Sequence, residues 1–240
     1  MAIFVAWGNI QQPYPFEIIP LHLLNEQLTH LKSTYKPVQQ RYYCRRLAHF
    51  LLWQLLQKAE IDTALLGSIQ RSSSNRPYFL ADNIDFNISH SDDWVAVVLQ
   101  VEEPHEKSAV GIDIEFVKKN RNYAALLQHF AAPQELVWFQ QKPCEERFYQ
   151  IWCGREALLK SQGIGIVKLS EVQHKPEELL LYSDYCPTGK LIFTTELPFY
   201  LALFCHQHIE KAQYFAWQNN QLMPQQLTQI IEYQVNLVKS

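Results

Sequence analysis

Trp94-Val95-Ala96-Val97-Val98 and Tyr200-Leu201-Ala202-Leu203-Phe204 are two apolar runs with the composition of buried strands. A second pair of segments, Pro37-x-x-x-Arg41-Tyr42-Tyr43 and Pro143-x-x-x-Arg147-Phe148-Tyr149, opens two stretches with helical spacing. Both pairs are displaced by the same 106 positions, from 94 to 200 and from 37 to 143. The equal displacement predicts an α+β fold of two similar halves, each a long helix followed by a strand hairpin. The alternative is a chance likeness, since amphipathic helices and strands resemble one another in unrelated proteins.

Other elements are expected around these segments. Helices are expected over 20–32, 37–59, from Pro133, over 143–162 and from Pro224 to the end. Strands are expected over 1–7, 84–89, 94–101, 110–116, 179–183, 190–195, 199–206 and 213–217. The polar stretch 102–108 is the predicted linker, so residues 1–105 and 106–240 are the two predicted subdomains.

Composition excludes several classes of protein. The 240 residues are 48% hydrophobic, which excludes an intrinsically disordered chain, and the net charge of -3 disfavours a dedicated nucleic-acid binder. No apolar run reaches the roughly 18 residues of a membrane-spanning helix. Five widely spaced cysteines without a CxxC pair indicate neither a disulfide framework nor a cysteine zinc site. We therefore expect a cytoplasmic protein without a membrane or nucleic-acid partner.

The segment Val110-Gly111-Ile112-Asp113-Ile114-Glu115 carries two acidic side chains on one face of a strand. Because strand side chains alternate, Asp113 and Glu115 share a face and the two isoleucines occupy the other. Neighbouring carboxylates repel each other unless a cation compensates, and Mg²⁺ prefers oxygen ligands. The alternative is an exposed edge strand with ordinary surface acids.

Two further segments can carry chemistry. Trp152, Glu156 and Lys160 follow one helix face at i, i+4 and i+8, although Glu156 and Lys160 are also compatible with an ordinary surface ion pair. His90 lies between Ser89 and Ser91 at a strand end, where it is suited to a phosphate or a base, or is a plain exposed histidine. The arginines that can supply positive charge are Arg76, Arg41, Arg45 and Arg46; exposed helix surface is the alternative for the last three.

The order of these segments resembles the 4'-phosphopantetheinyl transferases, in their two-domain, pseudodimeric Sfp-type class. The motifs that carry the resemblance are Arg-Pro, Asn-Ile-Ser-His-Ser, Gly-Ile-Asp-Ile-Glu and Trp-x-x-Arg-Glu-Ala-x-x-Lys, between Arg76 and Lys160. The resemblance implies two α+β subdomains related by a pseudo-twofold axis, with the active site in the cleft between them. Subdomain 1–105 would bind coenzyme A, and subdomain 106–240 would hold the acids and the catalytic helix.

The resemblance also implies a reaction. The enzyme, a holo-[acyl-carrier-protein] synthase, would move the 4'-phosphopantetheine arm of coenzyme A onto a serine of an apo acyl carrier protein or peptidyl carrier domain. It would release 3',5'-ADP. The carrier of fatty acid biosynthesis is one candidate partner, and a monomer is expected. The open alternatives are a Mg²⁺-dependent phosphodiesterase that acts on holo carrier, and a non-catalytic protein that binds coenzyme A or a carrier.

Matching position by position implies roles for individual residues. Asp113, Glu115 and Glu156 fall on Mg²⁺-binding acids, with Glu156 also a candidate base, and Lys160 falls on the lysine near the reacting phosphates. Coenzyme A contacts fall on Arg76, Ser89 and His90, and less firmly on Arg41 and Arg45. Two departures from the pattern are Arg155, where the family commonly has lysine, and Asp92-Asp93, where glycine is often found. They put a phosphate contact and the shape of a turn in doubt.

Overall fold

The computed structural model describes residues 2–31, 33–118 and 121–237. The α-helices are α1 (Glu26–Thr29), α2 (Lys36–Lys58), α3 (Tyr123–Leu127), α4 (Pro133–Gln141) and α5 (Glu145–Ser161). Five short 3₁₀ turns are η1 (Phe16–Ile18), η2 (Leu21–Leu23), η3 (Thr63–Ser68), η4 (Ile166–Glu171) and η5 (Ile209–Lys211), counted over those ranges.

Two larger sheets contain most of the strands. The first has the order β12-β11-β1-β5-β4, with bounds Gln221–Gln225, Ala212–Gln218, Ala2–Asn9, Trp94–Val101 and Ile84–Ser91. The second has the order β6-β10-β9-β13-β8-β7, with bounds Val110–Glu115, Tyr200–Cys205, Gly189–Thr194, Ile230–Val235, Leu180–Tyr182 and Gln173–Lys175. A small ribbon pairs β2 (Gln70–Arg71) with β3 (Pro77–Tyr78). The mixture of helices and sheets confirms the α+β class.

The sheets contain two sets of strands with the same connectivity. In the first, β1 and β4 both pair antiparallel with β5, and α2 follows β1. In the second, β6 and β9 both pair antiparallel with β10, and α5 precedes the β9–β10 pair. This agrees with a long helix followed by a hairpin in each half; the pseudo-twofold axis itself stays a prediction.

The chain does not complete one sheet before it begins the other. Strand β11 pairs in parallel with β1, and β13 then returns to pair with β9 of the second sheet. The first sheet is therefore built from both ends of the chain. The division of the chain into subdomains 1–105 and 106–240 stays a prediction.

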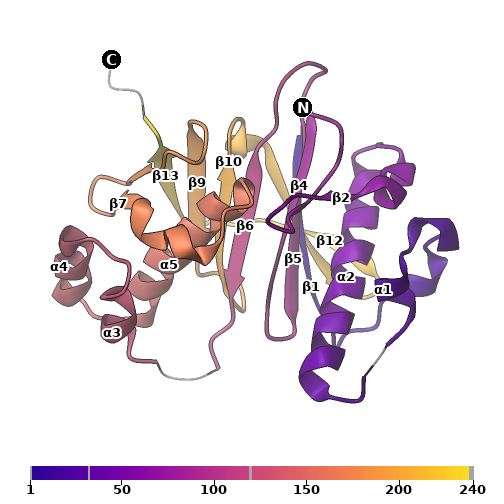
Figure 1. Ribbon diagram of the computed structural model, residues 1–240, viewed down its shortest axis with the longest axis horizontal. Helices are drawn as coiled ribbons and strands as arrows, with labels where there is room; N and C mark the ends of the chain where they lie inside the picture. The colour runs from indigo at the N-terminus through magenta and orange to yellow at the C-terminus, as the bar shows by residue number, and fades with distance from the viewer. Residues whose placement is uncertain (1, 32, 119–120, 238–240) are drawn as a thin grey trace.

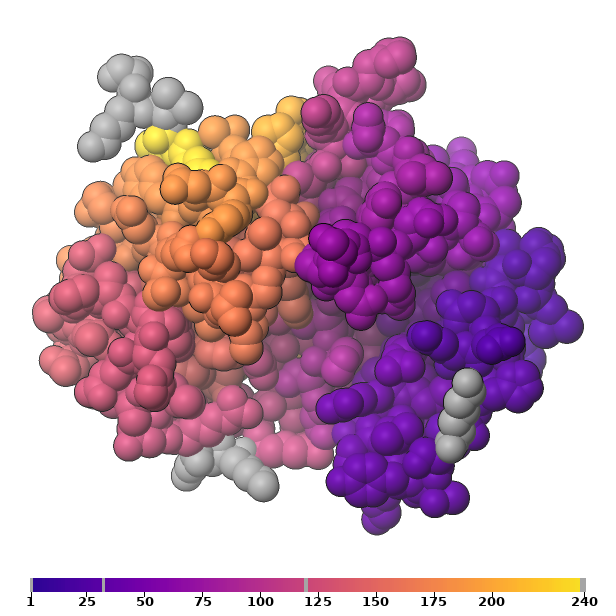
Figure 2. Space-filling model, in the orientation of Figure 1, coloured from indigo at the N-terminus to yellow at the C-terminus, as the bar shows by residue number. Residues whose placement is uncertain are grey.

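Helices cover the outer faces of the two sheets (Figure 1). α2 packs on β5 and β1 over a core that includes Leu47, Leu51 and Phe86, and α5 packs on β6 and β10. The inner faces meet in a further core to which β6 contributes Ile112 and Ile114. In Figure 2 the surface is recessed along the boundary between the purple N-terminal atoms and the pink-to-orange atoms of residues beyond 110.

One glycine sets the distance between α5 and the second sheet. A Cβ on Gly111 would overlap the carbonyl oxygen of Ala157 and lie 2.9 Å from Cβ of Ser161. Only glycine permits this approach, because every other residue carries a Cβ. The helix therefore lies directly over β6, and this close contact is at Gly111, two residues before Asp113.

Two expected helices are absent where they were predicted. Over 20–32, of which residue 32 lies outside the described ranges, the structure forms η2 and α1. Asn25, whose side chain accepts from the Gln27 N–H, begins a new short helix there. Beyond Pro224 the described residues form strands, because Asn219 and Asn220 take positive φ and turn β11 into β12. The expected first strand is present from residue 2, with residue 1 outside the described ranges.

The turn between β4 and β5 keeps a tight shape without glycine. Asp92 has φ 55°, in the left-handed region that aspartate tolerates better than most residues. Its carboxylate accepts hydrogen bonds from Gln40 of α2 and from Lys118. These contacts resolve the doubt that Asp92-Asp93 raised about the turn.

Candidate functional site

Edge strands β4 and β6 are joined by a row of side chains, which we call the β4 row: Asp85, Asn87, Ser89 and Ser91. Each accepts a hydrogen bond from an N–H of β6 or just beyond it, at 3.0–3.2 Å, and the donors in order are Val110, Ile112, Ile114 and Phe116. Side chains two apart on a strand face one way, so the row satisfies donors that an edge strand leaves unpaired. The row thereby determines where the two acids of β6 lie relative to the first sheet.

Asp113 is held by one neighbour from helix α5 and one from strand β4. Its Oδ1 accepts from Lys160 Nζ at 2.7 Å and from Ser89 Oγ at 3.1 Å. Its Oδ2 is buried without a hydrogen-bond partner among the described residues, although the neutral Cys153 thiol faces the carboxyl. Such an acceptor is costly to bury, and a cation would satisfy it.

Glu115 lies on the same face of β6. Trp152 Nε1 donates to its Oε1 and Ser91 Oγ donates to its Oε2, both at 3.1 Å. Burial and the neighbouring Asp113 carboxylate raise the pKa of Glu115. Ile112 and Ile114 pack on the opposite face, which confirms the predicted alternation.

Glu156 occupies the α5 face between Trp152 and Lys160. It is 8% exposed, and burial followed by the Asp113 carboxylate raises its pKa to about 7. A carboxyl with that pKa exchanges a proton near neutral pH, as a general base must. Burial favours the neutral amine of Lys160, but Asp113 outweighs it and raises the pKa of Lys160. Lys160 therefore carries a positive charge, and its ammonium group contacts the Asp113 carboxylate directly.

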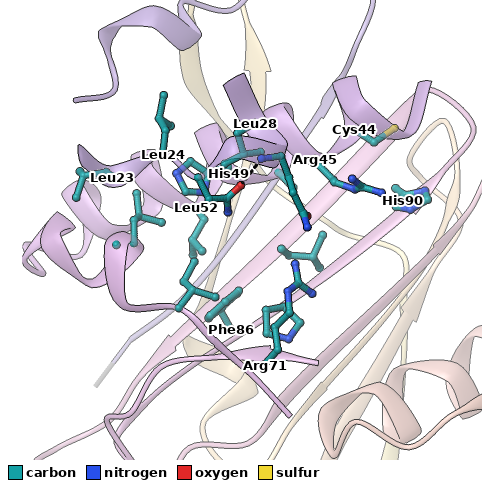
Figure 3. A pocket seen from close by; sticks show the side chains of 18 of the residues that line it. Leu23, Leu24, Leu28, Cys44, Arg45, His49, Leu52, Arg71, Phe86 and His90 are labelled. Atoms are coloured by element: carbon teal, nitrogen blue, oxygen red, sulfur yellow. Dashed lines mark hydrogen bonds between the residues drawn. The ribbon is translucent and has the colours of Figure 1, made fainter. Parts of the chain in front are cut away.

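A pocket of about 260 Å³ lies on the other face of β4, beneath α2 (Figure 3). Its walls combine apolar and polar side chains, and those of Arg45, Arg71 and His90 line one side of it (Figure 3). Loss of hydration and the charges of Lys160, Arg41 and Arg45 lower the pKa of His90. Hence Ser89 and His90, although adjacent, serve different places: the serine faces the acids and the histidine faces the pocket.

Arg76 is engaged with the protein itself. Its NH2 group donates to both carboxylate oxygens of Asp85, at 2.7 and 2.8 Å, and its Nε donates to the Lys160 carbonyl at 3.0 Å. The pair is about seven-eighths buried. Arg76 therefore links the β4 row to the end of α5.

Arg155 points away from the acids. It is fully buried, and it contacts Glu135 of α4 and the carbonyls of Leu169 and Val172. His174 Nδ1 lies 3.1 Å from the other oxygen of Glu135, and together His174 and Arg155 outweigh burial and lower the pKa of this carboxyl. The positive charge at position 155 thus supports the packing of α5 against α4.

The carboxylates have the donor chemistry of a magnesium site. Asp113 Oδ2 is an unpaired buried acceptor, and the three acids Asp113, Glu115 and Glu156 are near enough for their charges to interact. Within the described ranges, no three His, Cys, Asp or Glu side chains are grouped closely enough to hold a metal as they stand. The residues fit Mg²⁺ by type and by charge.

Comparison with known proteins identifies the family. A family model described as the 4'-phosphopantetheinyl transferase superfamily matches residues 109–218, from the start of β6 to the end of β11. A Haemophilus influenzae protein assigned as a 4'-phosphopantetheinyl transferase is 50% identical over 237 residues, 98% of this chain and 100% of its own. The chain belongs to the 4'-phosphopantetheinyl transferase superfamily.

More distant members of the superfamily match smaller parts of the chain. A Synechocystis protein with the same assignment is 33% identical over 106 residues, 42% of this chain and 40% of its own. The 4'-phosphopantetheinyl transferase HetI of Nostoc is 29% identical over 98 residues, 40% of this chain and 39% of its own. Membership makes the protein a transferase of this type. None of the described helices has the length and apolarity needed to cross a bilayer.

The structure brings together most of the residues singled out in the sequence. Asp113, Glu115, Glu156, Lys160 and Ser89 form the acid cluster, and Arg45 and His90 line the pocket, with Arg41 one turn before Arg45 on α2. Arg71, Asn87 and Asp85 were not predicted from the sequence as site residues. The alternation Asp85-x-Asn87-x-Ser89-x-Ser91 was a usable signal, because a strand with a regularly polar face must pair that face with something.

Proposed function

We propose that the protein transfers the 4'-phosphopantetheine group of coenzyme A to a serine of an apo acyl carrier protein or peptidyl carrier domain, with release of 3',5'-ADP. One observation carries the proposal: two consecutive residues of β4 face two different sites. Ser89 contacts the acids and Lys160 on one face of the strand, and His90 lines the cation-lined pocket on the other. A phosphorylated nucleotide suits the pocket, and a pyrophosphate extending from it would reach the cluster.

The pocket is suited to the nucleotide end of coenzyme A. Arg45, Arg71 and His90 offer N–H donors to phosphate, and apolar walls such as Leu52 and Phe86 accept a base. Arginine forks bind phosphate oxygens in pairs, which gives orientation as well as affinity. Ser89 and Arg76 contribute by fixing Lys160 against the first sheet. Ser89 contacts its ammonium group, and Arg76 contacts its main-chain carbonyl.

The acid cluster is suited to the chemistry. Glu156 accepts the proton of the carrier serine, whose oxygen then attacks the β-phosphorus of coenzyme A as the bond to 3',5'-ADP breaks. Lys160 is placed to neutralise negative charge that develops on the phosphates. Asp113, Glu115 and Glu156 would hold Mg²⁺, which neutralises pyrophosphate charge in reactions of this class.

Incubation with coenzyme A and Mg²⁺ tests the proposal. Intact mass measurement should show one phosphopantetheine added to an apo carrier, with 3',5'-ADP in the supernatant. Loss of that mass from a holo carrier would instead identify a phosphodiesterase. Coenzyme A binding without any change in carrier mass, across apo carriers of fatty-acid, polyketide and peptide-synthetase type, would identify a non-catalytic binder.

A further inference from the structure

Asn87 lies where β4, β6 and α5 meet. Its Oδ1 accepts from the Ile112 N–H of β6, and its Nδ2 donates to the Lys160 carbonyl of α5, both at 3.2 Å. The residue is 4% exposed, so these two bonds are made away from water. Asn87 thus uses both ends of its amide, one for the sheet and one for the helix.

Asn87 differs in this from the rest of the β4 row. Ser89 reaches the ammonium group of Lys160 and Ser91 reaches the Glu115 carboxylate, so both act on side chains. Asp85 is occupied by Arg76. The second bond of Asn87 goes to the main chain of the helix.

The Lys160 carbonyl needs partners from outside the helix. It lies in the last turn of α5, where carbonyls have no partner further along the helix and helices fray. The Gly163 N–H donates to it at 3.1 Å, and Asn87 and Arg76 of the first sheet complete its contacts. The first sheet therefore secures the end of a helix that otherwise packs on the second.

This attachment determines where Lys160 and Glu156 lie. The Lys160 side chain has several rotatable bonds, so the place of its ammonium group depends on its main chain, and Glu156 lies one turn earlier on the same face. Gly111 sets how near α5 is to β6, while the Asn87 link opposes rotation and fraying at its end.

We propose that Asn87 is a positioning residue for the transfer reaction, which holds the end of α5 so that Glu156 and Lys160 address the same phosphates. The inference rests on the proposed function. Among the described residues Asn87 forms a hydrogen bond with the Lys160 main chain and with neither of those side chains, so it acts through the main chain of α5.

Two substitutions separate this role from a general structural one. In Asn87→Ser the hydroxyl can still accept from the Ile112 N–H, as Ser89 and Ser91 do at the next two rungs, but it is too short to reach α5. Asn87→Ala loses both bonds. We expect both variants to lower kcat by about tenfold or more, because small misplacements of catalytic groups are costly, while KM for coenzyme A changes less than threefold.

A matched control is Asn83→Ala. The Asn83 amide donates at 3.1 Å to the Glu102 carbonyl across the base of the β4–β5 hairpin. Asn83→Ala should leave kcat within about twofold of the wild-type value. Wild-type kcat in Asn87→Ser, with a fall only in Asn87→Ala, would show that the bond to β6 suffices and would overturn the proposal. A rise in KM without a fall in kcat would overturn it as well.

Amide hydrogen exchange provides a readout that does not depend on activity. In Asn87→Ser the Ile112 amide should stay protected, while the amides of Ser161 and Gln162 exchange faster as the end of α5 frays. Unchanged exchange at those two amides would contradict the proposal. A wild-type protein that modifies no carrier would refute the proposed function alone, since the exchange experiment would still test the attachment of α5.

Discussion

Gly111 of β6 faces the Ala157 carbonyl of α5 so closely that a side chain between them has no room. The contact lies two residues from Asp113 and one residue from Glu156, so the distance between strand and helix is also the distance across the acid cluster. The tight packing of β6 against α5 is therefore a condition for the site.

Gly111→Ala should displace α5 from β6. We expect a fall in stability of about 1–3 kcal/mol from overpacking, and a loss of transfer larger than the loss of stability explains. The measurements are urea denaturation and initial rates at a temperature where the variant is folded. Gly154→Ala in α5 is the control, because its Cβ would meet its nearest neighbour at 4.0 Å and alanine favours helices. Wild-type transfer in Gly111→Ala would show that the spacing is not needed.

Asp113→Asn should remove the effect of Mg²⁺ on stability. In the wild type a divalent ion compensates the three acids, so the melting temperature should keep rising with the logarithm of the Mg²⁺ concentration. The rise corresponds to a stabilisation of about 2.7 kcal/mol at 100 times the dissociation constant. The amide keeps the shape of Asp113 but supplies no charge, so the rise should disappear along with nearly all transfer. An equal Mg²⁺-dependent rise in both proteins would place the ion elsewhere, and full transfer in chelator would exclude it from the reaction.

Glu156→Gln tests the group whose pKa lies at about 7. For the wild type kcat should rise with pH and then level off, since the base must be ionised, and the positive charge of bound Mg²⁺ should move this rise below pH 7. The variant should transfer of order 10²-fold more slowly and without that rise. Near-normal transfer in the variant, or the same pH profile in both proteins, would reject Glu156 as the base.

Stability should respond to pH in the opposite sense. The folded pKa of Glu156 is above its ordinary value of 4.5, so its contribution to stability is fully present below 4.5 and is lost as pH rises to about 7. Between pH 5 and pH 8, in chelator, the wild type should lose about 2 kcal/mol relative to Glu156→Gln. Urea denaturation at the two pH values measures this difference, and a constant gap would contradict the raised pKa.

Arg155→Met should destabilise the protein without a direct effect on ligand binding. The substitution leaves the Glu135 carboxylate buried without its arginine, which costs about 3–5 kcal/mol. Adding Glu135→Gln should recover part of that loss, because the amide carries no charge. Calorimetry on folded protein should give an unchanged coenzyme A dissociation constant, since Arg155 faces away from the site. A large increase in that constant would place Arg155 on the ligand.

Arg45→Ala and Arg71→Ala should weaken recognition of the 3'-phosphate of coenzyme A. A charge-assisted phosphate contact is worth about 1.5–3 kcal/mol, or about 10–100-fold in affinity. Each variant should therefore discriminate less between coenzyme A and the analogue that lacks this phosphate. Arg76→Ala provides the contrast: it leaves the buried Asp85 carboxylate without a compensating cation, so stability should fall first. If Arg76→Ala alone abolishes discrimination, the phosphate is read at Arg76.

Much of the acid cluster could be predicted from local periodicity. The alternation along 110–115 assigned Asp113 and Glu115 to one face, and the spacing of Trp152, Glu156 and Lys160 assigned these three to another. Both assignments hold because the side-chain period of a strand or a helix is a property of the element itself. Periodicity likewise predicted α2 and the β4–β5 hairpin, whose apolar faces are long and regular.

Partners across elements could not be predicted in this way. Lys160 pairs with Asp113, 47 residues away, although Glu156 is only four residues away in the sequence. Arg155 lies on the same helix as Glu156 and Lys160, but on the side that faces α4, where Glu135 compensates its charge. The end of the chain forms strands because β12 pairs with the edge of β11 and β13 pairs with the edge of β9. Local sequence propensity cannot predict these edges, because they exist only once the sheets have formed.

The sequence by itself determined the fold class, the long helices, the paired strands and the faces on which the acids and the lysine lie. Only the tertiary structure decided that Asn87 joins a strand to a helix end, that Ser89 faces the acids while His90 faces the pocket, and that Arg71 reaches the pocket. The physical reason is that periodicity specifies which side of an element a residue occupies. What lies opposite that side depends on how the two sheets pack, through contacts between residues far apart in the chain.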